Sequence, residues 1–104
     1  MPRREYFKEH GYYVYILTSE RNGTLYIGVS NSLYRRTLEH KLAKKENSFT
    51  AKYKTNKLVY FEIYKYIEDA IKKEKQLKFW KRKWKLELIE KFNPTWRDLF
   101  EDME

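Results

Sequence analysis

The sequence predicts a small α+β fold, in which a three-stranded antiparallel sheet is flanked by helices. Three short segments are rich in aromatic and β-branched residues, which favours strands. The segments between and after them carry apolar residues at helical spacing. The chain has 104 residues, a length that fits one domain with its own core. We expect that domain at residues 12–99, between a flexible lead-in at 1–11 and an acidic tail at 100–104.

The first two strands are expected at residues 12–17 and 24–29, where Tyr, Val, Ile and Leu recur. The segment that joins them contains the pair Asn22-Gly23. This pair favours the positive φ angles of a tight hairpin turn. The sequence therefore predicts that the two strands are antiparallel neighbours.

The register of this hairpin decides where two tyrosines point. With Asn22-Gly23 at the centre of the turn, Tyr15 lies opposite Ser30, and Tyr26 lies opposite Ser19. Because side chains alternate between the faces of a sheet, this register places Tyr15 and Tyr26 on one face. A loop longer by one residue would put them on opposite faces.

The middle of the chain carries one helix signal and one strand signal. The N-cap residues of Ser30-Asn31-Ser32 precede a helix that is expected over residues 33–42. Residues 44–56 are polar and without periodicity, which is typical of a loop. Residues 58–64 are again aromatic and β-branched, and they predict the third strand.

The last third of the chain is expected to be helical. Apolar spacing begins at Ile67 and predicts a long helix toward Trp84, which residues 86–92 either continue or form anew. Asn93-Pro94 should end it, because the residue before a proline disfavours α geometry. A last short helix is expected over residues 96–103.

The chain is basic and free of cysteine. It has 23 Lys and Arg against 15 Asp and Glu, which gives a net charge of +8. The absence of cysteine excludes disulfide scaffolds, thiolate zinc sites and cysteine nucleophiles. The beginning of the chain lacks the apolar stretch of a secretory signal, and the longest apolar run is too short to span a membrane. We therefore expect a cytoplasmic protein without membrane contact.

The positive charge is concentrated in residues 72–85, which hold eight Lys or Arg, one acid and three aromatic residues. Cations beside aromatic rings suit phosphate neutralisation combined with base or sugar contacts. A lysine-rich helix is as often a solvated surface, but the overall charge favours nucleic acid, DNA first, as the partner. The candidate phosphate contacts are Arg35, Arg36, Lys72, Lys75, Lys78, Lys81, Arg82 and Lys85.

One acid stands in an unusual place. In the helix that begins at Ile67, the apolar stripe runs through Ala70, Ile71 and Leu77, and Glu74 completes it. An acid on the core side of a helix is costly unless it is paired, protonated or bound to a cation. A buried ion pair is the commoner solution. A single Glu also binds Mg²⁺ when water and phosphate oxygens complete the coordination.

An ordered set of residues resembles the GIY-YIG endonuclease superfamily. It consists of Tyr13-Val14-Tyr15, then Tyr26-Ile27-Gly28 after ten intervening residues, then Arg36 and His40, and later Glu74. The two tripeptides alone are a weak signal, whereas the ordered set across most of the chain is specific. The chain is most similar to the small single-domain bacterial branch of the family.

Two positions depart from the family pattern. Tyr13 stands where the first tripeptide has glycine, and Val29 stands where some members have a lysine. Asn93 is the candidate for an asparagine that the family carries late in the domain. Gly28 keeps the glycine of the second tripeptide, where the absent side chain would allow close approach of backbone or substrate.

The resemblance implies hydrolysis of a DNA phosphodiester with one divalent metal ion, Mg²⁺ or Mn²⁺. Glu74 would hold the metal ion, and Arg36 would bind the phosphate oxygens. Tyr15 or Tyr26 would orient or deprotonate the attacking water. His40 would position the phosphate or share the proton transfer.

Functions of other classes stay open at this point. The same fold without cleavage would be a nucleic-acid-binding or protein-interaction module, for which the lysines alone would suffice. An RNA-associated protein would have similar size and charge. The joint presence of the tyrosines, Arg36, His40 and Glu74 favours the enzyme. For the enzyme, we expect structure-specific cleavage in DNA repair or recombination, with a protein partner that supplies specificity.

Overall fold

The structure, a computed structural model, describes residues 11–42 and 53–103. The predicted α+β class and the three-stranded antiparallel sheet are confirmed. The expected lead-in before Gly11 and most of the expected loop at 44–56 lie outside the described residues. The elements in chain order are β1 (Tyr12–Thr18), β2 (Leu25–Ser30), α2 (Leu33–Lys41), β3 (Lys57–Tyr64), α4 (Ile67–Phe79), α5 (Arg82–Phe92) and the 3₁₀ helix η1 (Leu99–Met103).

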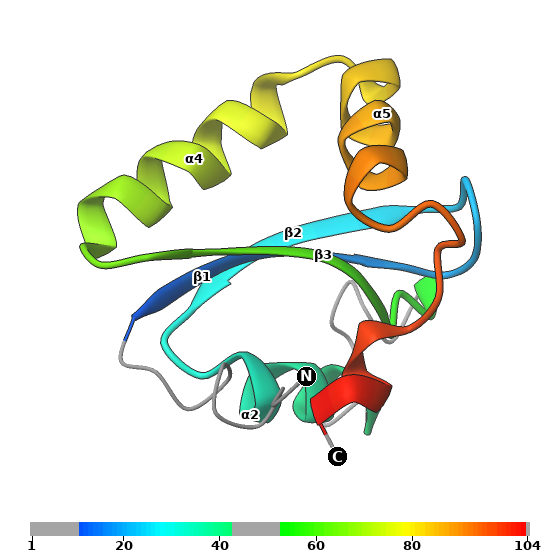
Figure 1. Ribbon diagram of the computed structural model, residues 1–104, viewed down its shortest axis with the longest axis horizontal. Coiled ribbons are helices and arrows are strands. Elements are labelled where there is room, and N and C mark those ends of the chain that lie inside the picture. Colours follow the sequence, from blue (N-terminus) through cyan, green and yellow to red (C-terminus); the bar gives the residue numbers. More distant parts are fainter. Residues whose placement is uncertain (1–10, 43–52, 104) are drawn as a thin grey trace.

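The sheet is the middle layer of the molecule. Its strand order is β2-β1-β3, and β1 is antiparallel to both neighbours. Helices α4 and α5 cover one face, and α2 and η1 lie on the other (Figure 1). Along β1, the side chains of Tyr13, Tyr15 and Leu17 enter the apolar cluster on the α2 side, whereas Val14 and Ile16 enter the cluster on the α4 side. The central strand is therefore buried on both faces, which explains its unbroken apolar sequence.

The turn between β1 and β2 is longer than the sequence predicts. The N–H of Ser19 donates to the carbonyl of Thr24 at 3.3 Å, and the N–H of Gly23 donates to the carbonyl of Glu20 at 2.8 Å. Residues 20–23 thus form a four-residue loop, within which Asn22 takes the positive φ of 59°. The prediction that Asn22-Gly23 alone forms the turn is wrong, although Asn22 does adopt the expected left-handed conformation.

The longer loop changes the register of the hairpin but not the faces. Tyr15 lies opposite Gly28, and Tyr26 lies opposite Leu17, two residues from the predicted pairing. A shift of two residues is even, so each side chain keeps its face of the sheet. Tyr15 and Tyr26 consequently share the α2 face, and their ring centroids are 6.3 Å apart.

The long helix that the sequence predicts is two helices. Helix α4 ends at Phe79, and both Trp80 and Lys81 are extended, with ψ angles of 149° and 148°. Helix α5 then begins at Arg82, so the prediction of one helix as far as Trp84 is wrong. The break allows α5 to turn back over the sheet, where Ile89 joins the apolar cluster of the α4 face.

The apolar stripe of α4 is narrower than its spacing predicts. Ala70 and Leu77 are buried, but Ile67 is 42% exposed and Ile71 is 37% exposed. One residue corresponds to about 100° around a helix, so Ile71 lies well away from the direction of Ala70. Glu74 lies between the two buried residues, and its side chain is 20% exposed. The prediction of a carboxylate on the core side of this helix is therefore met.

The end of α5 is fastened to the sheet. The helix ends at Phe92, as the Asn93-Pro94 pair predicts. The buried side chain of Asn93 donates to the carbonyl of Val59 at 3.3 Å and to that of Arg97 at 2.8 Å. Asn93, the candidate for the late asparagine, thus makes a structural connection between α5, β3 and the C-terminal segment.

The last helix is shorter than predicted. Trp96 has a φ of 56°, which is incompatible with the start of a right-handed helix, and η1 begins only at Leu99. Phe100 and Met103, which lie in the segment expected as a tail, are buried in the cluster on the α2 side. Asp98 anchors this segment, because its carboxylate accepts the backbone N–H of Leu58 at 3.1 Å.

Candidate functional site

Four of the predicted site residues come together where α2 faces β1 and β2. The hydroxyl of Tyr15 and Nε2 of His40 are 3.2 Å apart. The ring of Tyr26 lies against His40, with ring centroids 5.0 Å apart. The guanidinium of Arg36, one helical turn before His40, hydrogen-bonds to the hydroxyl of Tyr15. We call Tyr15, Tyr26, Arg36 and His40 the tyrosine cluster.

Gly28 makes the position of Tyr15 possible. The two residues are paired across β1 and β2. A Cβ atom built on Gly28 would lie 2.5 Å from the hydroxyl oxygen of Tyr15 and 2.6 Å from its Cζ. The phenol of Tyr15 therefore lies directly over Gly28 and crosses the edge strand β2. The sequence predicted that backbone or substrate would approach Gly28 closely. In the structure it is a side chain of the protein itself, the Tyr15 phenol, that does so.

Arg36 is held from two sides and still reaches solvent. Its Nη1 donates to Glu39 at 2.9 Å, one helical turn further along α2. Its side chain is 35% exposed. Glu39 was not among the site residues expected from the sequence, although its spacing of three residues from Arg36 on one helix was the available signal. Tyr15 and Glu39 together orient the guanidinium toward the sheet.

The environment of Tyr15 keeps its phenol protonated. Burial, followed by the neighbouring Tyr26, raises the pKa of Tyr15 to about 12, while Arg36 acts in the opposite direction. The carboxylate of Glu74 adds to the rise. At neutral pH Tyr15 is therefore a hydroxyl that accepts from Arg36 and hydrogen-bonds to Nε2 of His40.

His40 is the uncharged partner of this hydroxyl. Burial and the charge of Arg36 lower the pKa of His40 to about 4, and Glu39 opposes this only in part. The imidazole is therefore uncharged at neutral pH, and the tautomer decides whether Nε2 accepts from the Tyr15 hydroxyl or donates to it. A histidine that resists protonation in this way acts as a hydrogen-bonding and positioning group beside the two phenols.

Glu74 approaches the tyrosine cluster from the other layer. Its carboxylate is paired with Nζ of Lys78 at 3.2 Å, one turn further along α4. Its charge contributes to the raised pKa of Tyr15. Glu74 therefore acts on the tyrosine cluster through its charge.

A metal site at Glu74 would have to be built around one carboxylate. Within residues 11–42 and 53–103, no group of three His, Cys, Asp or Glu side chains could hold a metal ion. Mg²⁺ is commonly bound through one or two carboxylates, with water and substrate phosphate completing the coordination. The mostly buried Glu74 fits this kind of site. Its pairing partner, Lys78, is 55% exposed, and such a helix pair contributes only a few tenths of a kcal/mol.

The predicted phosphate contacts are on the surface, but several already have partners in the chain. Lys72, Lys75 and Lys81 are exposed. Arg82 donates to the carbonyl of Gly23 at 2.7 Å and so fastens α5 to the hairpin loop. Lys85 donates to the carbonyl of Lys78 at 3.4 Å across the helix break, and Arg35 lies 3.9 Å from Glu39. Arg82 thus has a structural role in addition to its charge.

Comparison with known proteins identifies the class. Residues 11–95 match the model of the GIY-YIG catalytic domain, so the chain belongs to the GIY-YIG family. The match covers both tyrosine tripeptides, Arg36, His40 and Glu74. Neither curated proteins nor solved structures gave a match. The class implies nuclease-type activity on a nucleic acid, and GIY-YIG nucleases generally depend on a divalent metal ion. Among the described helices, none is long and apolar enough to cross a membrane.

The contact between Gly28 and Tyr15 predicts the effect of a single methyl group. In Gly28→Ala the new Cβ would overlap the Tyr15 phenol, and the free energy of unfolding should fall by about 1–3 kcal/mol. Chemical denaturation measures this. In a Tyr15→Leu background the same substitution should cost clearly less. Equal costs in the two backgrounds would show that the phenol is not what Gly28 accommodates.

The depressed pKa of His40 predicts a pH-dependent stability. The pKa is about 4 in the folded state and 6.5 in the unfolded chain, so the unfolded chain binds more protons between these values. The free energy of unfolding should therefore fall as pH drops from about 6.5 to 4, with His40 contributing roughly 2–3 kcal/mol. Urea denaturation of the native protein and of His40→Gln at both pH values isolates this contribution. An identical pH dependence in both proteins would contradict it.

Proposed function

We propose that this chain is a metal-dependent endonuclease that hydrolyses a DNA phosphodiester, with residues 12–99 as the catalytic domain. The tyrosine cluster beside the charge of Glu74 carries the proposal. A binding module would need only exposed lysines, whereas here a buried phenol, a neutral imidazole and an oriented guanidinium are packed together. Burying such groups is costly, and they match the chemistry that strand cleavage requires.

Arg36 would bind the scissile phosphate. Its planar guanidinium suits two phosphate oxygens, and Glu39 and Tyr15 fix its direction before the substrate arrives. The partial exposure of the side chain leaves it accessible to a strand that lies over β2. Donors placed in advance stabilise the charge that develops in the transition state.

Tyr26 would handle the proton of the attacking water, and His40 would hold the two phenols in place. Tyr15, with a pKa near 12, stays protonated and keeps its hydroxyl beside Nε2 of His40. Tyr26 is only partly buried and lies against the uncharged imidazole. In this assignment the Tyr26 hydroxyl takes up the proton of the attacking water while its own proton passes to a solvent water.

Glu74 would hold Mg²⁺ or Mn²⁺, with substrate phosphate and water completing the coordination. The ion would stabilise the charge on the phosphate and on the departing 3′ oxygen. Lys78, being largely exposed, is free to rotate into solvent or to meet the phosphate backbone. We further propose that the substrate is structured DNA of repair or recombination and that a protein partner contributes specificity.

The assignment of Glu74 predicts a separation of binding from cleavage. Glu74→Gln should abolish Mg²⁺- or Mn²⁺-dependent nicking of supercoiled, branched and single-stranded DNA. Affinity for the same DNA should be unchanged or higher, because a negative charge is removed. Glu68→Gln, which changes an exposed acid in the first turn of α4, is the matched control and should cleave normally. Cleavage by Glu74→Gln at the native rate would remove the metal-ligand role.

The roles of the two phenols predict different losses. Tyr26→Phe should lower the single-turnover cleavage rate by at least about a hundredfold, because it removes the proton relay. Tyr15→Phe should have a smaller effect on rate, because the phenol of Tyr15 stays protonated and does not take up the proton of the water. A normal cleavage rate for Tyr26→Phe would show that another group takes the proton of the attacking water.

The ion pair between Glu74 and Lys78 supports a second candidate, a non-cleaving nucleic-acid-binding module. In that case the carboxylate would be neutralised by the lysine permanently. Assays with supercoiled, branched and single-stranded DNA and with structured RNA distinguish these candidates. Binding without metal-dependent nicking of any DNA favours the module, and a preference for structured RNA favours an RNA-associated role.

A further inference from the structure

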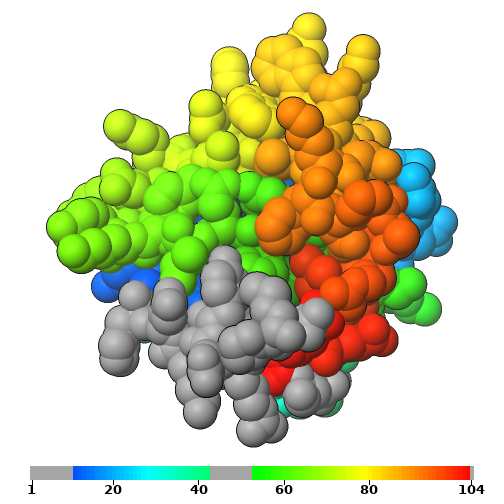
Figure 2. Space-filling model, viewed as in Figure 1, coloured from blue at the N-terminus to red at the C-terminus, as the bar shows by residue number. Residues whose placement is uncertain are grey.

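The corner between α4 and α5 carries an unusual group of aromatic side chains. Phe79, the last residue of α4, is 90% exposed, and Trp84 on α5 is 46% exposed. Trp80 follows Phe79 in the chain and meets Trp84 edge to face, with ring centroids 6.0 Å apart. We call Phe79, Trp80 and Trp84 the aromatic corner. In the space-filling view it belongs to the yellow and orange segment, whose side chains project from the top of the molecule (Figure 2).

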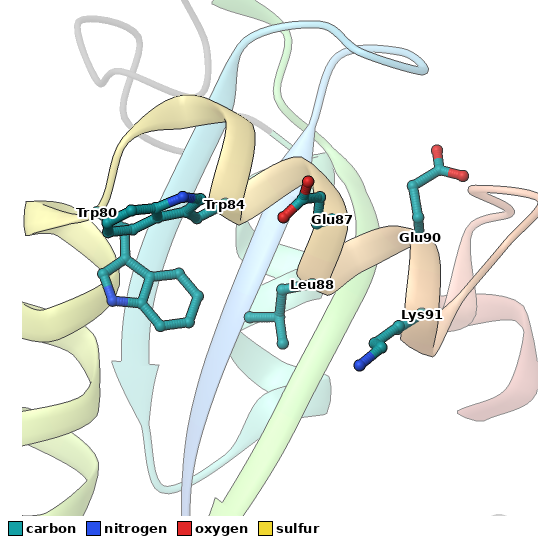
Figure 3. A pocket seen from close by; sticks show the side chains of 6 residues that line it. All are labelled: Trp80, Trp84, Glu87, Leu88, Glu90 and Lys91. Atoms are coloured by element: carbon teal, nitrogen blue, oxygen red, sulfur yellow. The ribbon is translucent and has the colours of Figure 1, made fainter.

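The two tryptophans form one end of a pocket of about 630 Å³. The other lining residues, Glu87, Leu88, Glu90 and Lys91, follow Trp84 along α5 (Figure 3). A volume in this range accommodates a small planar molecule. The apolar and aromatic end is the end that adjoins the helix break, where Trp80 and Lys81 are extended.

Cations are placed directly at these rings. Nζ of Lys73 lies over Trp80, 5.3 Å from its ring, and Nζ of Lys81 lies over Trp84, at 5.8 Å. The surrounding residues 72–85 hold eight Lys or Arg and one acid. An occupant that is flat where it meets the rings and negative beside them would complement this surface. A nucleotide has both properties, since its base stacks on aromatic rings while its phosphate meets lysines.

The acids of the pocket do not oppose this occupant. Glu90 forms an ion pair with Arg21, whose Nη2 lies 3.1 Å from its carboxylate, and the indole N–H of Trp96 also donates to this carboxylate. Glu87 is exposed and lies one helical turn from Trp84 (Figure 3). It is one acid among the lysines of this end, two of which lie over the tryptophan rings.

We propose that the aromatic corner stacks an unpaired base of the DNA substrate, so that the protein favours DNA with unpaired nucleotides beside the cleavage point. This inference deepens the proposed function and rests on it. Trp80 follows Glu74 by six residues, about 9 Å along a helix axis. A base held there lies about two to three nucleotide steps from a phosphate at Glu74. In duplex DNA every base is stacked already, whereas an unpaired base is available to the rings.

Binding without metal tests this inference apart from catalysis. In EDTA, fluorescence anisotropy compares a fully paired DNA duplex with the same duplex interrupted by a short unpaired thymine stretch. The native protein should prefer the interrupted duplex, and that duplex alone should quench tryptophan fluorescence. Stacking on one aromatic residue accounts for roughly a tenfold or greater difference in affinity.

Phe79→Ser is the main variant, because a side chain 90% exposed contributes little to folding. It should lower the affinity for the interrupted duplex about tenfold and leave the paired duplex within about twofold. Trp84→Leu should act in the same way. Tyr66→Ser is the matched control: Tyr66 is 58% exposed at the opposite end of α4, with Nζ of Lys65 5.6 Å from its ring. This control should bind both probes as the native protein does.

Three outcomes would overturn the inference. The first is native affinity of Phe79→Ser for both probes, and the second is an equal loss on both, which would indicate general charge or folding effects. The third is unchanged tryptophan fluorescence with every DNA, which would point to a protein segment as the occupant. Absence of metal-dependent nicking would instead defeat the proposed function while leaving the base preference measurable.

Discussion

The site depends on one packing arrangement, the phenol of Tyr15 lying across Gly28. This places the hydroxyl of a central-strand residue over the edge strand, where α2 brings Arg36 and His40 to meet it. With any larger residue in place of Gly28, the ring would have to move, and both hydrogen bonds of the hydroxyl would change. The tyrosine of the first tripeptide thus needs the space that the glycine of the second tripeptide leaves open.

The chemical states of the tyrosine cluster follow from the same burial. A buried phenol resists ionisation, and a buried imidazole beside a guanidinium resists protonation. The structure therefore places a protonated phenol, a neutral imidazole and a permanent cation, the guanidinium of Arg36, close together. These states are fixed by the protein before a substrate is bound, which is the preorganisation that catalysis by hydrogen bonding and charge requires.

The break at Trp80 and Lys81 gives the α4 layer its shape. Because the chain is extended at these two residues, α5 starts in a new direction and covers the sheet beside β3. Arg82 then reaches the hairpin loop, and Glu90 meets Arg21 from the same hairpin. The corner that results leaves Phe79 outside any core and holds the two tryptophans together. A continuous helix would have carried these rings away from the sheet along its axis.

The strands, the order of the helices and the family membership follow from the sequence alone, because aromatic and β-branched segments and an ordered set of site residues are local patterns. The common face of Tyr15 and Tyr26 was also predictable, since it depends only on whether the register is odd or even. The loop length, the break in the helix and the burial of Phe100 depend on contacts between distant segments. The local sequence pattern therefore did not predict them. Only the tertiary structure shows that Glu39 orients Arg36, and that Tyr15 fills the space above Gly28. Exposure, pairing and pKa are properties of the packed surroundings, and a sequence specifies those surroundings only once it has folded.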